Sequence, residues 1–142
     1  MVLRPEAVRE RLLRLEDVMS RLEELARVEP EVLWRSYRDV WAVERGLQLA
    51  AEIVLDVGNH ILSAHFGVSA RDYEDIITQL GAQGVIDPGL QERLRGLGGF
   101  RNILVHGYLR MDPKKIAQSL AEGPARFADF AAAVRQWLTA LG

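Results

Sequence analysis

The chain has 142 residues, of which 49% are hydrophobic, so we expect residues 1–142 to form one domain with a core of its own. It has no cysteine, which excludes disulfides and thiolate chemistry, and no apolar run of the roughly 20 residues that span a bilayer, so we expect a cytoplasmic protein without membrane contact. The net charge of −2 argues against a protein that binds nucleic acid over its whole surface.

The first predicted helix carries one apolar stripe. Its apolar residues recur in steps of four and three between residues 8 and 26, with Glu and Arg on the other faces. Pro30 interrupts this pattern, and it fits the first turn of a following helix.

The second predicted helix is the longest and is apolar on two sides. Its main stripe runs from Leu33 to Ile61, about eight turns, and Gly67 marks its end. Three further apolar residues lie on a second side, namely Trp41, Leu55 and Leu62. Such a helix needs two partners, either two elements of its own chain or one of them from another subunit.

Three shorter helices are predicted in the second half of the chain. Ser69 is a candidate cap for a helix that Gly81 closes. Asp87-Pro88 and Asp112-Pro113 each pair an N-cap residue with a proline at the first helical position, and they open the fourth and fifth helices. Gly123-Pro124 should kink or break the last one. Since nothing alternates with a period of two, the sequence predicts an all-α, up-and-down bundle of about five helices.

The segment from Gly98 to Tyr108 holds the candidate catalytic residues. Arg101 and His106 are five apart, which separates them by about 140° round an unbroken helix. They converge only if the helix ends near His106 and the chain turns, which Gly107 permits. A histidine can take the proton of a ribose 2′-hydroxyl while a guanidinium binds the phosphoryl oxygens, so this pair suffices to cleave RNA without a metal.

Two neighbours extend this candidate site. Asn102 offers a further hydrogen bond to the reacting phosphate, and Tyr108 can orient the phosphate, stack on a base or be modified. A structural interpretation stands beside the catalytic one: His106 is then a helix-end histidine bonded to backbone, and Arg101 a surface salt-bridge partner.

The basic residues are concentrated in one part of the chain. Between residues 88 and 115, six basic residues face two acidic ones, so this window carries +4 while the remainder carries −6. Either one local segment binds phosphate or a helix has a solvated basic face. On the first interpretation, five cations line the RNA path: Arg93, Arg95, Arg110, Lys114 and Lys115.

A polar cluster lies on the second predicted helix. Asn59 and His60 lie three and four residues after Asp56, so the three residues share one face. There they either fix helix packing or hold Arg101 in place from behind the catalytic pair. His60 and His65 are five apart, which does not suit a zinc site, and no nucleotide-binding fingerprint is present. We therefore expect no metal and no cofactor.

The segment Arg-Asn-Ile-Leu-Val-His-Gly-Tyr, residues 101–108, resembles the R-x4-H-x-Y signature of HEPN proteins of the HepT toxin family, with no departure from the motif. Residues 43–48 and 55–61 are similar to the family's long second helix, and residues 73–86 with 99–102 to its central portion. The resemblance extends roughly from Arg14 to Leu120.

This resemblance implies a dimer in which the arginine–histidine pair of each subunit lines a shared cleft. It implies a metal-independent endoribonuclease that leaves cyclic-phosphate ends and acts as the toxin of a toxin–antitoxin pair. Carried over, Arg101 binds phosphate, His106 is the acid/base, and Tyr108 receives AMP from a small nucleotidyltransferase antitoxin of the MntA type. The alternatives are a non-catalytic HEPN module that binds nucleotide or protein, and a purely structural helical subunit.

Overall fold

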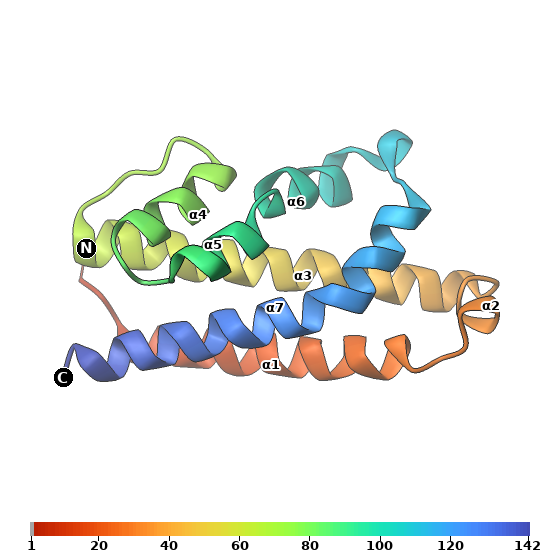
Figure 1. The fold of residues 1–142 in the computed structure, drawn as a ribbon, viewed down its shortest axis with the longest axis horizontal. Helices are drawn as coiled ribbons and strands as arrows, with labels where there is room; N and C mark the ends of the chain where they lie inside the picture. The colour runs from red at the N-terminus through yellow and green to blue at the C-terminus, as the bar shows by residue number, and fades with distance from the viewer. Residues whose placement is uncertain (1) are drawn as a thin grey trace.

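The structure is a computed structural model that describes residues 2–142, and every regular element in that range is helical, as predicted. Three long helices form the body: α1 (Pro5–Ala26), α3 (Tyr37–Ile61) and α7 (Pro113–Ala140). The shorter elements are α2 (Pro30–Leu33), α4 (Tyr73–Ala82), α5 (Pro88–Leu94) and α6 (Leu97–His106), with a π-helical turn at Leu62–Phe66 and a 3₁₀ turn at Tyr108–Arg110. Figure 1 shows α1 and α7 side by side, and α4, α5 and α6 together on the opposite side of the molecule.

The core lies where the three long helices meet. The α1 stripe buries Val8, Leu12, Leu15, Val18 and Leu22 against α3 and α7. Phe130 of α7 is the largest of the fully buried side chains. Among the described helices, none combines the length and apolar character that crossing a bilayer requires.

The second predicted helix is shorter at its start than expected. The prediction of one continuous helix from Leu33 to Ile61 is wrong, because α2 ends at Leu33 and α3 begins at Tyr37. The Ser36 hydroxyl accepts a hydrogen bond from the Asp39 N–H at 3.3 Å, so a cap interrupts the apolar stripe. On the second side of α3, Leu55 is buried within the chain, whereas Trp41 is 65% exposed.

Two further boundaries correct the sequence prediction. The cap of α4 is Asp72 rather than Ser69, since the Asp72 carboxylate accepts from the Asp75 N–H at 2.8 Å. The fourth predicted helix is two helices, because Gly96 adopts a φ of +87°, which ends one helical run before α6 begins. The predicted caps Asp87 and Asp112 are confirmed.

Pro124 does not break the last helix. It lies buried inside α7, which continues from Pro113 to Ala140. Figure 1 shows α7 changing direction before it runs along α1, so of the two predicted outcomes the helix shows the kink and not the break.

Candidate active site

Helix α6, which carries the motif, is anchored at its start by α4. No side chain of its own caps α6; instead the Glu74 carboxylate of α4 accepts from the N–H groups of Gly96 at 2.8 Å and Gly98 at 3.1 Å. A Cβ at position 98 would lie 2.6 Å from the Glu74 backbone nitrogen. Glycine there lets the two helices approach closely enough for the carboxylate to reach both donors.

The other end of α6 matches the expected stop at His106. The Gly107 N–H donates to the Ile103 carbonyl at 2.9 Å. The φ of Gly107 is −99°, so the turn does not depend on a left-handed conformation. Glycine is favoured for a different reason: a Cβ would meet the Ile103 Cα at 3.0 Å.

Arg101 is held by three contacts. Its Nη2 lies 3.4 Å from Glu52 Oε1 of α3, and its Nη1 donates to Asn102 Oδ1 at 3.3 Å. The guanidinium carbon lies 4.6 Å from the ring centroid of Tyr73, within cation–π range. The side chain is only 17% exposed, and it lines a hollow that Glu52, Tyr73 and Asp56 also line. These contacts fix the guanidinium at the edge of an open depression.

His106 lines a different hollow. That depression is also lined by Asn102, Tyr108 and Arg110, and the Tyr108 side chain projects from the 3₁₀ turn with 77% of its surface exposed. Within one chain Arg101 and His106 are therefore not brought into a single pocket. Asn102 connects the two hollows, because it accepts from Arg101 and lines the wall beside His106.

Comparison with models of known families matches residues 15–134 to the ribonucleases described as HepT-like. The chain belongs to this family. The matched range contains Arg101, His106 and Tyr108.

The tRNA nuclease HepT of Aphanizomenon flos-aquae is 32% identical over 87 residues, which cover 61% of this chain and 58% of that protein. YutE, a cytosolic protein of Bacillus subtilis, superposes with a TM-score of 0.83 at 22% identity, covering 97% of this chain and 93% of YutE. The tri-AMPylated HEPN toxin of Shewanella oneidensis, solved in complex with its MNT antitoxin, gives a TM-score of 0.82 at 19% identity, covering 91% and 96% of the two chains. These likenesses confirm the predicted HEPN-like fold.

The three residues of the α3 polar cluster in this HepT-like chain line one hollow beside α1. Asp56 and Asn59 also line the hollow of Arg101. His60 does not; it faces the start of α1, where its Nε2 accepts from the Arg4 N–H at 3.3 Å. Glu52, which contacts Arg101 directly, was missed by sequence reasoning, although it lies one helical turn before Asp56 on the same face.

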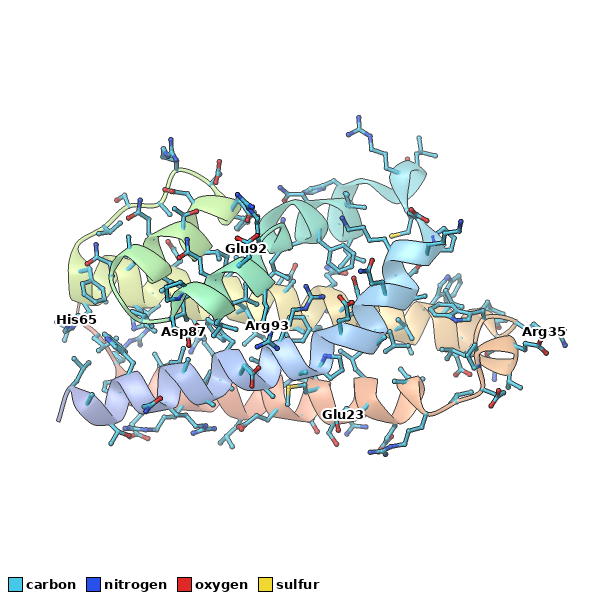
Figure 2. The ribbon with its side chains drawn as sticks, in the orientation of Figure 1. Glu23, Arg35, His65, Asp87, Glu92 and Arg93 are labelled. Atoms are coloured by element: carbon cyan, nitrogen blue, oxygen red, sulfur yellow. The ribbon has the colours of Figure 1, made fainter. Side chains whose placement is uncertain are left out.

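The predicted RNA-binding cations are scattered. Arg93 forms an ion pair with Asp129 at 2.6 Å and lies between α5 and α7 (Figure 2), and Arg95 pairs with Glu92 at 3.1 Å. Arg110 lines the hollow of His106. The two lysines, Lys114 and Lys115, lie in the first turn of α7, with Lys114 beside an apolar groove that contains Trp34.

The three histidines have separate environments. His65 packs edge-on against Phe66 and Trp137, with ring centroids 4.7 and 5.1 Å away. Within residues 2–142, no three His, Asp or Glu side chains are grouped as the ligands of a metal ion would be.

His60 makes the stability of the fold depend on pH. Burial, and then the charges of Arg4 and Arg11, lower the pKa of His60 below its usual 6.5. The folded state therefore binds fewer protons than the unfolded state, so the contribution is complete above pH 6.5 and is lost as pH falls toward the folded pKa. Urea unfolding between about pH 8 and about pH 5 should show this loss. The His60→Gln protein keeps an acceptor for Arg4 and should lose less stability over that range; equal losses in both proteins would contradict the assignment.

Proposed function

We propose that this chain is a metal-independent endoribonuclease and the toxin of a toxin–antitoxin pair. The observation that carries the proposal is the fixed guanidinium of Arg101, which Asn102 connects to the hollow of the exposed His106. Its family and the relative named a tRNA nuclease support ribonuclease chemistry, and the toxin from Shewanella oneidensis supports the biological role.

His106 would act as general base. It takes the proton of a ribose 2′-hydroxyl, whose oxygen attacks the adjacent phosphorus while the 5′-oxygen leaves and is protonated in turn. The products are a 2′,3′-cyclic phosphate and a 5′-hydroxyl. Arg101 would bind the phosphoryl oxygens; of its five N–H donors, some remain for phosphate beyond those used by Glu52 and Asn102.

The separation of Arg101 from His106 favours a homodimeric site. Each chain offers the two groups in separate hollows, so a second copy facing them would close the open surface into one shared cleft. Trp41, 65% exposed, and Tyr37, 61% exposed, provide apolar area near the start of α3. Sedimentation at micromolar concentration should give twice the chain mass of 16.0 kDa, and a 16.0 kDa species would contradict the dimer.

The decisive experiment is cleavage of RNA by the purified protein, produced without any partner, in excess EDTA. Total cellular RNA and purified transfer RNA are the first substrates to test. Discrete fragments that end in cyclic phosphate are expected. Intact RNA, with Tyr108 shown by mass spectrometry to be unmodified, would instead favour the non-catalytic HEPN module that binds nucleotide or protein.

Tyr108 is the proposed target of an MntA-type nucleotidyltransferase antitoxin. Its exposed ring lies beside His106, so AMP added there would place bulk and negative charge where an RNA phosphate must bind. Incubation with the antitoxin and ATP should add AMP to the wild type and stop cleavage. The Tyr108→Phe protein should gain no AMP and should continue to cut RNA; AMP on that variant would place the modification elsewhere.

A further inference from the structure

A further hollow, distinct from those of Arg101 and His106, lies between the start of α1 and the C-terminal half of α3. Its volume is about 200 Å³, and its polar lining comes from Arg4, Arg11, Asp56, Asn59, His60 and Ser63. It contains two guanidinium groups and one carboxylate, so its charge is positive while His60 is neutral.

The two arginines are available to an anion. Within the part of the chain that the structure describes, neither Arg4 nor Arg11 has a carboxylate within ion-pair distance, and Arg11 makes only a hydrogen bond from Nη1 to the Ala7 carbonyl at 3.0 Å. Arg93 and Arg95, by contrast, are already paired with acidic side chains. The positive charges of Arg4 and Arg11 also act inside the hollow. After burial, they are the largest cause that lowers the pKa of His60.

This hollow adjoins the hollow of Arg101. Asp56 and Asn59 line both hollows, so this part of α3 is the wall between them. We call the segment from Glu52 to His60 the crest; α4 and α6 lie on one side of it and α1 on the other. From Glu52 to His60 the crest is eight residues, or about 12 Å of helix. A single strand laid along α3 would thus meet Arg101 first and the pair Arg4 and Arg11 next.

We propose that Arg4 and Arg11 form a second phosphate subsite, which binds an RNA backbone phosphate beyond the one that Arg101 holds. That the ligand is RNA rests on the proposed function. The subsite itself rests on the two guanidinium groups, neither of which has a carboxylate partner among the described residues. Asp56 would repel a phosphate placed on the crest, so the phosphates bind against the two walls. A ribose then lies over Asp56, whose carboxylate accepts from the 2′-hydroxyl that DNA lacks.

The test measures binding of a fluorescent single-stranded RNA by anisotropy over a range of salt concentrations. The Arg4→Gln/Arg11→Gln protein is compared with Arg9→Gln/Arg14→Gln. The second protein also loses two positive charges near the start of α1, but from residues that are paired with Glu6 and Asp17. Each lost phosphate contact should reduce the slope of log affinity against log salt by about 0.7 for a single strand. Because the subsite binds one phosphate, we expect the Arg4→Gln/Arg11→Gln protein to lower the slope by about 0.7, and the Arg9→Gln/Arg14→Gln protein to leave it nearly unchanged.

The outcomes separate the subsite from the enzyme. If the two variants give equal slopes while the wild-type protein still cuts RNA, the subsite alone is overturned. RNA that is bound through Arg4 and Arg11 but never cut would retain the subsite and remove the ribonuclease. Wild-type protein that neither binds nor cuts RNA would overturn both. Melting temperatures of both variants close to that of the wild type confirm that the comparison concerns folded protein.

Discussion

The His106→Ala protein is expected to fold normally and to cut RNA about 10²–10⁴-fold more slowly than the wild type, which is the usual contribution of a general acid–base group. The side chain is exposed at the end of α6, so its removal leaves no cavity in the core. The measurement is the initial rate of cleavage in EDTA, with folding followed by circular dichroism.

The matched control for this variant is His65→Gln. His65 lies at one end of the molecule, away from α6 (Figure 2), against Phe66 and Trp137. That protein should cut RNA at the wild-type rate, because no reacting group has been changed. A His106→Ala protein as fast as His65→Gln would remove His106 from the mechanism.

The Gly98→Ala protein is expected to lose about 1–3 kcal/mol of unfolding free energy, the usual cost of an added methyl group in a closely packed site. The new Cβ would lie 2.6 Å from the Glu74 nitrogen and 2.8 Å from the Tyr73 carbonyl carbon, both backbone atoms that cannot rotate away. Because α6 must then move from α4, Arg101 should also lose its position over Tyr73, and cleavage should slow.

Gly99→Ala tests this explanation within the same helix. An added Cβ there meets nothing within 4 Å, so the better helix propensity of alanine should stabilise the protein by up to about 1 kcal/mol. Urea unfolding of the two variants should thus give changes of opposite sign. Two variants with equal stability would show that contact with α4 does not decide the role of Gly98.

The sequence predicts the helices well where one local signal is strong. The α1 stripe and the two Asp-Pro caps each depend on residues within one or two turns, so they are visible without a structure. The boundaries at Ser36 and Gly96 were less clear, because an apolar stripe continues across each of them and hides a short interruption. At the start of α4, both Ser69 and Asp72 are residue types that cap helices, and the sequence alone did not separate them.

The candidate site could be predicted only as a motif. The motif residues are close in sequence, namely Arg101, Asn102, His106 and Tyr108. Their expected roles were inferred from the residue types and from the resemblance to the HepT family. The contact of Glu52 with Arg101 joins residues 49 apart in the chain, and the cap from Glu74 to Gly98 joins residues 24 apart. Such pairs depend on which helices pack together, and periodicity within one helix does not contain that information.

The cap that Glu74 provides to α6 also has a consequence for the persistence of the motif. Helix α6 has only ten residues and two glycines, shorter than the roughly 12–15 residues at which an isolated helix becomes marginally stable in water. The helical conformation of α6 therefore depends on its packing against α4 and α3. In native-state hydrogen exchange, the amides of α6 should exchange together with those of α4, in an opening that leaves α1, α3 and α7 protected. The helix that carries the residues proposed to cut RNA would then unfold and refold with α4 as one cooperative unit, many times for each global unfolding of the protein.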